Sequence, residues 1–382
     1  MTRLERARTI VDAYEALVLS ELPAGALLYD AHTHLGDDID GMEGRYEELL
    51  GILDRYGFAQ AFVFCLDEVD REPGFCAPND RTLGCAERAE GRFVPFVRLD
   101  LTERPLEEAK RCLDQGARGI KLHPRAQGFT LDDERLGPIF ELAVERGVPI
   151  LIHGGRGLPP IAAHLEKLVQ RCGDLRLIIA HAGIADMAEL AGRLGGVPGV
   201  FFDTSVWSSV DLLDLYRRVS PEQIVYASDY PYGRQPNSLL AALRTARLAG
   251  FDDRQLRAML GENARGIAEG APVPELSPPT GATALVQPLT FARIHQYISM
   301  AVPLLWLRQQ DAVGALGLAV NASRERDGHE DEAERIQELL ATASELWHQG
   351  HEVASDDERV AAFRTAIQLV NLADLFTVTT PA

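Results

Sequence analysis

The stretch YDAHTHLG, residues 29–36, places three polar side chains on alternate positions just where an apolar run ends. Successive side chains of an extended strand point to opposite faces, so Asp30, His32 and His34 are predicted to point to the same face. Burying two imidazoles and a carboxylate side by side is costly unless something binds them. The stretch therefore predicts a buried strand whose end carries a binding site.

Seven more apolar runs follow the first one, and each is followed by an amphipathic stretch or a loop. The eight runs begin near residues 25, 59, 92, 117, 148, 175, 199 and 223. They are continuously apolar, as parallel strands that are buried on both faces are. Eight strand–helix units within about 250 residues predict an α/β fold of the (β/α)8 TIM-barrel class, with a C-terminal all-α extension. A doubly wound open sheet is the alternative.

Titratable side chains gather at the ends of six of these runs. They are His32 and His34, Arg98, Lys121 and His123, His153, His181, and Asp229. In a TIM barrel this edge of the strands carries the active site. Closure of the barrel would bring the histidines and Asp229 together. Three or four nitrogen and oxygen ligands with one open position are typical of a catalytic Zn²⁺ or a similar divalent ion.

The motifs DAHTHLG, GIKLHP, LIHGG, IIAHAG, ASDYP and GENARGI occur in this order between Tyr29 and Ile267. Together they resemble the amidohydrolase-related family of the amidohydrolase superfamily, which includes aminocarboxymuconate-semialdehyde decarboxylase-like metal-dependent hydrolases. The resemblance implies one divalent metal ion per chain, most simply Zn²⁺. It also implies a set of metal ligands: His32, His34, His153 and Asp229. Asp229, as ligand or general base, and His181, which would activate the metal-bound water or polarise the substrate, would be the catalytic groups.

Six further residues are candidates for binding substrate: Lys121, His123, Arg98, Arg125, Arg156 and Trp207. In dinuclear relatives a carboxylated lysine on the fourth strand bridges two metal ions, and Lys121 could play that part. We favour one metal ion, with Lys121 and His123 supporting the ligands or contacting the substrate. A guanidinium fork suits a substrate carboxylate, although each arginine could instead form a surface ion pair. Trp207 would either line the pocket or pack in the core.

The composition narrows the choice of partners to a small-molecule substrate. The formal net charge of −19 argues against nucleic acid and against an anionic membrane surface. The five cysteines are odd in number and form no Cys-x-x-Cys pair, which favours free thiols and a cytoplasmic location. The N-terminal 22 residues are expected to form an amphipathic helix rather than a signal peptide. No apolar run approaches the roughly 20 residues needed to cross a membrane.

We predict three parts in the chain. Residues 1–270 form the metal-dependent hydrolase barrel, 271–288 are a proline-rich linker, and 289–382 form a helical domain of unknown role. Pro303 is expected to kink or divide the first helix of that domain. The helical domain could form a homo-oligomer, cover the barrel mouth as a lid, or dock another protein.

Four functions are compatible with these patterns. The first is a metal-dependent hydrolase that uses an activated water on a small amide, ester or lactone. The second is a metal-dependent nonoxidative decarboxylase of an unsaturated or aromatic carboxylate, which release of carbon dioxide would distinguish. The third is a phosphodiesterase or nuclease, against which the acidic charge counts. The fourth is a barrel scaffold with a partner-binding tail, against which the complete set of ligands counts.

Overall fold

The computed structural model describes residues 1–206, 208–281, 285–309, 311–325 and 328–380. Within these residues, nine strands form one sheet with the neighbour order β2-β1-β3-β4-β5-β6-β7-β8-β9. The strands are β1 (Leu28–Asp37), β2 (Glu43–Gly44), β3 (Phe58–Cys65), β4 (Phe93–Arg98), β5 (Gly119–Leu122), β6 (Ile150–Ile152), β7 (Leu177–Ile179), β8 (Val200–Asp203) and β9 (Ile224–Val225). The eight predicted runs are all strands. The two-residue β2, which pairs antiparallel with the end of β1, is the addition.

The sheet closes into a barrel because the segment after β9 returns to β1. All neighbouring pairs from β1 to β9 are parallel. The backbone amide of Ala31 donates to the carbonyl of Tyr226 at 2.9 Å, and that of His34 donates to Tyr230 at 2.7 Å. Thr33 and Tyr230 form a parallel bridge at the same seam. The TIM-barrel prediction is therefore confirmed, and the open-sheet alternative is wrong.

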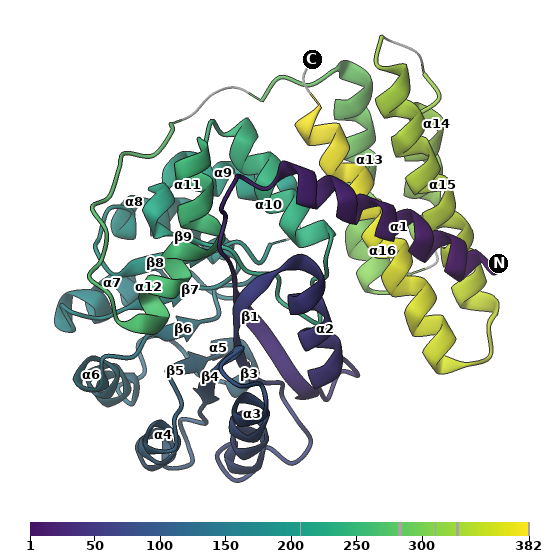
Figure 1. Cartoon of the computed structure of the whole chain (residues 1–382). Helices are drawn as coiled ribbons and strands as arrows, with labels where there is room; N and C mark the ends of the chain where they lie inside the picture. The colour runs from purple at the N-terminus through teal and green to yellow at the C-terminus, as the bar shows by residue number, and fades with distance from the viewer. Residues whose placement is uncertain (207, 282–284, 310, 326–327, 381–382) are drawn as a thin grey trace.

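Helices cover the outside of the sheet (Figure 1). They are α2 (Tyr46–Tyr56), α3 (Cys76–Arg88), α4 (Pro105–Asp114), α6 (Leu136–Arg146), α7 (Ala162–Arg171), α8 (Met187–Leu194), α9 (Ser209–Arg218), α10 (Asn237–Leu248), α11 (Asp253–Arg257) and α12 (Asn263–Glu269). The four-residue α5 (Pro124–Gln127) lies at the barrel mouth instead. Short helical turns are η1 (His181–Gly183), η2 (Pro221–Gln223) and η3 (Ala258–Glu262). Several helices end in a left-handed glycine, such as Gly57 after α2 and Gly147 after α6. Glycine adopts this conformation without a steric penalty, which explains the sequence pattern.

Two buried clusters hold the barrel together. The smaller cluster fills its interior with side chains that recur every second residue along the strands, as in other TIM barrels. It contains Tyr29, Ala31, Phe62, Phe64, Val94, Phe96, Leu151, Ile178, Ala180, Phe201, Val225 and Ala227. The larger cluster joins the strands to the surrounding helices and continues into the C-terminal helices. The barrel and the C-terminal helices therefore share one continuous apolar core.

Both ends of the chain contribute to the helical part of the molecule (Figure 1). The helical region consists of α13 (Leu289–Trp306), α14 (Ala312–Ala322), α15 (Glu330–Glu352) and α16 (Asp356–Thr379). Helix α1 (Arg3–Glu21) lies along α16, and the rings of Tyr14 and Phe376 have centroids 5.5 Å apart. Pro303 does not divide α13, which continues past it to Trp306, although proline cannot donate to the carbonyl of Ser299. No described helix is both long enough and apolar enough to span a bilayer.

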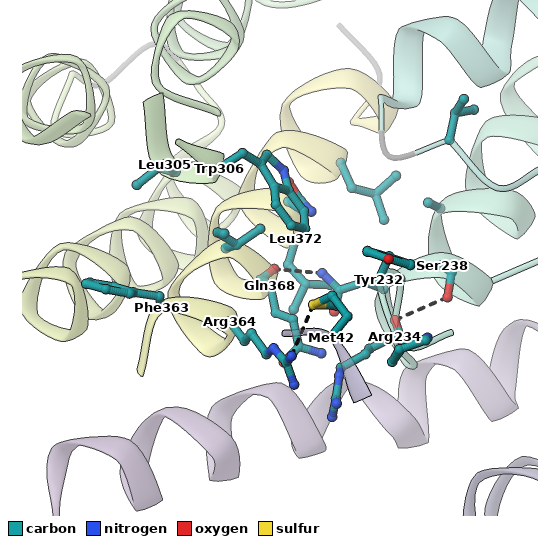
Figure 2. A pocket seen from close by; sticks show the side chains of 18 of the residues that line it. Met42, Tyr232, Arg234, Ser238, Leu305, Trp306, Phe363, Arg364, Gln368 and Leu372 are labelled. Atoms are coloured by element: carbon teal, nitrogen blue, oxygen red, sulfur yellow. Dashed lines mark hydrogen bonds between the residues drawn. The ribbon is translucent and has the colours of Figure 1, made fainter. Parts of the chain in front are cut away.

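The helical region is attached to the barrel through several polar contacts. The proline-rich segment runs along the barrel, where Arg176 Nη2 donates to the carbonyl of Ala271 at 2.6 Å and Ser277 Oγ donates to Glu222 Oε2 at 2.6 Å. Figure 2 shows the pocket between the two parts, where α13 and α16 face the loops that follow β1 and β9. Asn237 Nδ2 donates to the carbonyl of Gln368 at 2.7 Å across this boundary. Because those loops lie at the carboxyl ends of the strands, the helical region sits beside the barrel mouth.

Candidate metal centre

Three predicted ligands converge at the barrel mouth. His32 and His34 lie on β1, and Asp229 lies in the loop after β9. His32 Nε2 and His34 Nε2 are 3.2 Å apart. Asp229 Oδ1 lies 3.3 Å from His32 Nε2 and 3.2 Å from His34 Nε2. All three side chains are buried, and their ligand atoms are close enough together to hold one metal ion. We call these residues the His–His–Asp group.

Asp203, at the end of β8, orients this group and was not predicted from the sequence. His32 Nδ1 donates to Asp203 Oδ2 at 2.7 Å. The other carboxylate oxygen accepts from the backbone amide of His181 at 2.7 Å and from Ser205 Oγ at 2.6 Å. A carboxylate behind a ligating histidine fixes its tautomer and leaves the opposite nitrogen with its lone pair. The signal for Asp203 was an acidic residue that directly ends the apolar run VFF at residues 200–202.

The electrostatics of the His–His–Asp group suit a bound cation. Burial lowers the pKa of His32 and of His34 well below the usual range, so both rings are neutral at pH 7. Burial raises the pKa of Asp229, while the nearby Lys121 acts in the opposite direction. Among the described residues, the buried Nδ1 of His34 has no hydrogen-bond partner. Two neutral nitrogens and one carboxylate that face each other at such distances match the donor set of Zn²⁺ and similar ions.

The backbone of two predicted catalytic residues is strained. Asp229 has a φ of 61° and His181 has a φ of 57°, in the left-handed region that favours glycine. Such conformations cluster at active sites, where the surrounding structure holds a side chain in a required direction. The backbone amide of Asp229 donates to the carbonyl of His32 at 2.9 Å, which fixes this loop to β1. The two strained residues, Asp229 and His181, are therefore also the two whose side chains are predicted to be catalytic.

A chain of three histidines lies beside the His–His–Asp group. His181 Nδ1 is 3.0 Å from the carbonyl of Ser205, which can only accept, so this nitrogen carries the hydrogen. His181 Nε2 then accepts from His153 Nδ1 at 2.9 Å, and the ring of His153 stacks on that of His123 at 3.8 Å. Burial lowers the pKa of all three imidazoles. The structure does not bring His153 into the His–His–Asp group, and its role as a metal ligand stays a prediction.

Lys121 and Asp30 occupy different positions relative to the group. Lys121 Nζ lies 3.3 Å from His32 Nε2 and over the ring of Phe64, and burial lowers the pKa of this amine. Asp30 does not join the group: its Oδ1 accepts from the backbone amides of Ser228 at 2.9 Å and His32 at 3.3 Å. The register of β1 against β3 shifts between Asp30 and Thr33, which interrupts the simple alternation that the sequence suggested.

The predicted arginines line the same cavity but differ in exposure. Arg98 is only 3% exposed, and its Nη2 lies 3.9 Å from Asp67 Oδ1. Arg156 is exposed and pairs with Asp211 at 2.7 Å, as in the surface-pair alternative. Arg125 lies on α5 and also faces the cavity. Trp207 lies outside the described residues.

The cavity has a volume of about 890 Å³ and draws its walls from both parts of the molecule. From the barrel come the His–His–Asp group, the histidine chain, Lys121 and the arginines. From the helical region come residues of α13 and α16, among them His295 and Asp374, which the sequence did not single out. Among the three roles considered for the helical region, this arrangement agrees with a cover at the barrel mouth. The volume is in the range of about 300–1,000 Å³ that is usual for small-molecule sites.

Comparisons with known proteins concern the family and the fold of this chain. The family model described as amidohydrolase matches residues 29–267, which leaves out α1 and the helical region. Among solved structures, IDCase of Metarhizium anisopliae in its apo form matches with a TM-score of 0.51 and 17% identity, over 65% of this chain and 98% of that chain. The 4-oxalomesaconate hydratase of Rhodopseudomonas palustris matches with a TM-score of 0.46 and 16% identity, over 64% and 96% of the two chains. No curated protein matches the sequence. At these identities the structural likeness concerns the fold alone.

Proposed function

This chain belongs to the amidohydrolase family and is an enzyme, and from this premise we propose that it is a metal-dependent hydrolase acting on a small amide, ester or lactone. The observation that carries the proposal is the convergence of His32 Nε2, His34 Nε2 and Asp229 Oδ1 in a buried group at the mouth of the barrel. Members of the family are generally metal-dependent. We propose Zn²⁺ as the metal, one ion per chain, held by these three residues with His153 as a further ligand.

The residues around the metal would each have a distinct task. A bound divalent ion would act as a Lewis acid and lower the pKa of a coordinated water to about 7. Asp229 would take up the proton from the attacking water and return it to the leaving group. His181 is held by donation from Nδ1 to the carbonyl of Ser205 and by His153 Nδ1, which donates to its Nε2. To polarise the substrate, His181 would have to take up a proton at Nε2 and release His153.

The cavity supports a small substrate with an acidic group. Arg98 is buried in the cavity wall, its Nε has no hydrogen-bond partner among the described residues, and its nearest carboxylate is 3.9 Å away. Asp67, at 3.9 Å, is too far away to form a hydrogen bond with this guanidinium, and a bidentate substrate carboxylate would supply one. Arg125 adds positive charge to the same wall, and His123 offers a neutral ring. Lys121, whose pKa burial lowers to about 7, adds positive charge in part. We expect no nucleic-acid or membrane partner, and we expect a cytoplasmic location.

The same cations favour one alternative reaction, a nonoxidative decarboxylation. Lys121 Nζ lies 3.3 Å from His32 Nε2, so a carboxylate that it bound would lie next to the metal. In that reaction the carbon–carboxylate bond breaks, carbon dioxide leaves, and a proton takes its place on carbon. Asp229 would be the group that supplies this proton.

A substrate panel tests the proposal and separates the two reactions. The zinc-loaded enzyme is offered lactones, esters, amides, and enoic and phenolic acids, while hydrolysis products and released carbon dioxide are both measured. We expect water-dependent cleavage of at least one lactone, ester or amide, and a loss of at least about a hundredfold in kcat for Asp229→Asn. A matched control is Asp214→Asn, because Asp214 lies on the outer side of α9 and pairs with Arg218. Carbon dioxide release without hydrolysis would establish the alternative, and turnover unaffected by Asp229→Asn would refute both.

A further inference from the structure

His295 and Asp374 form a polar pair in the part of the cavity wall that the helical region supplies. His295 lies on α13 and Asp374 lies on α16, and both face the cavity that contains the His–His–Asp group. His295 Nδ1 donates to Asp374 Oδ1 at 2.7 Å. Both side chains are largely buried, with exposed fractions of 23% and 10%. The family model does not extend to either residue, since it ends at residue 267.

The hydrogen bond leaves one ring nitrogen of His295 for another partner. Because a carboxylate only accepts, Nδ1 carries a hydrogen and the ring is held in one orientation. Among the described residues, Nε2 of His295 has no recorded hydrogen-bond partner. An imidazole nitrogen without a partner, on a residue that lines a cavity, is available to a ligand. The neighbouring Ser299 and Asn371 line the same wall and offer further polar atoms.

The charges around His295 differ from those around the other histidines of the cavity. Asp374 raises the pKa of His295, whereas burial acts in the opposite direction, and Asp211 on α9 adds to the increase. Asp211 is itself paired with Arg156 at 2.7 Å. The histidines of the barrel have lowered pKa values and are neutral. The helical region therefore contributes the histidine of this cavity that is best suited to carry a positive charge.

We propose that His295 binds an acidic group of the substrate, with Nε2 as the hydrogen-bond donor and Asp374 as the residue that positions the ring. The inference deepens the proposed function, on which it rests, because it names a carboxylate subsite away from the metal ligands. A charged donor prefers a charged acceptor, and such hydrogen bonds are about twice as strong as neutral ones. The helical region then has a specific role, since it completes the substrate site that the barrel alone leaves open on one side.

Binding of straight-chain dicarboxylates to the full-length, zinc-loaded enzyme tests this subsite. The probes are malonate, succinate, glutarate and adipate, and the readout is the histidine ring resonances in NMR spectra, with His295 identified by its loss in His295→Gln. We expect at least one probe to shift the His295 resonance, and His295→Gln to weaken its binding about tenfold or more. Asp374→Asn should lower the pKa of His295 and weaken binding most near neutral pH. His348→Gln is the matched control, because His348 is exposed on α15 and should leave binding unchanged.

The outcomes separate this inference from the proposed function. If no dicarboxylate moves the His295 resonance, or if His295→Gln binds every probe as tightly as the wild type, the inference is wrong. In that case zinc binding and turnover of a panel substrate would still support the proposed function. If the subsite binds a dicarboxylate as expected but the zinc-loaded enzyme hydrolyses nothing in the panel, the proposed function fails and the carboxylate subsite stands.

Discussion

Replacing Asp203 by asparagine tests how the site prepares His32 for a metal ion. In the wild type, one carboxylate oxygen accepts from His32 Nδ1 at 2.7 Å, and the other accepts from the backbone amide of His181 and from Ser205 Oγ. An asparagine side chain has only one accepting oxygen. If this oxygen stays with His181 and Ser205, the amide NH₂ faces His32 Nδ1, and the ring must carry its hydrogen on Nε2. The lone pair that would bind the metal is then lost.

The size of the effect follows from this geometry. If the amide turns the other way, His32 keeps its tautomer, but the buried donors of His181 and Ser205 lose their acceptor. One orientation therefore loses the metal-binding tautomer of His32, and the other leaves two buried donors without an acceptor. Loss of a partner behind a ligating histidine typically weakens metal binding about 10- to 100-fold. That range corresponds to about 1.4–2.7 kcal/mol. We expect Asp203→Asn to fold and to bind zinc with an affinity lowered by this amount.

Zinc titration of the metal-free enzyme in competition with a fluorescent chelator measures the effect at pH 7.5. The matched control is Glu222→Gln. Glu222 is also a buried carboxylate, and it accepts from Ser220 at 2.7 Å and Ser277 at 2.6 Å, but it lies outside the cavity. The control should lose stability without losing zinc affinity. Zinc affinity of Asp203→Asn within twofold of the wild type, or an equal loss of zinc affinity in Glu222→Gln, would show that Asp203 does not prepare His32 for the metal ion.

Two other predictions address the histidines of the cavity. A Cβ on residue 155 would lie 2.5 Å from His153 Nε2, so Gly155→Ala should displace that ring and lower kcat/KM by about tenfold or more. The control Gly192→Ala, whose added Cβ would have no atom within 4 Å, should keep the kcat/KM of the wild type. Equal kinetics of the two variants would contradict this prediction. The metal-free protein should lose stability as the pH falls below about 6.5, because burial lowers the pKa of His32, His34 and His123 in the folded state and only the unfolded chain takes up these protons. Each such histidine contributes up to about 1.4 kcal/mol per pH unit below its unfolded pKa, and His153 and His181 act in the same direction. His295, Asp30 and Asp229, whose pKa values are raised in the folded state, oppose them, and urea unfolding between pH 7.5 and 5.5 measures the net slope. A stability that is constant over this range would contradict the assigned burial.

The fold could be predicted from the sequence because each strand of the barrel is a short apolar run with a polar residue at its carboxyl end. The run that begins near residue 59 corresponds to β3, and the run near 199 corresponds to β8. Eight strand–helix units within about 250 residues fit a barrel, but the sequence left an open sheet as the alternative, which only the seam between the segment after β9 and β1 excludes. The packing of α1 on α16 was not predictable, because an amphipathic helix shows only that it packs and not against which partner.

The site was predicted where it depends on one strand end at a time, and missed where it depends on contacts between distant segments. His32, His34 and Asp229 stand in conspicuous motifs and do converge. Asp203 looks like any acidic residue after a strand, and its contact with His32 spans 171 positions in the sequence. His295 belongs to a helix whose docking on the barrel follows from surface shape, which no local pattern records.

The most direct test of the proposed metal centre is the metal content of the purified enzyme, measured by elemental mass spectrometry together with the protein concentration. We predict close to one divalent ion per chain in the wild type and in the control His348→Ala. The folded double variant His32→Ala/His34→Ala should contain almost none. A folded double variant that retains the metal content of the wild type would contradict the central claim that His32, His34 and Asp229 hold the ion.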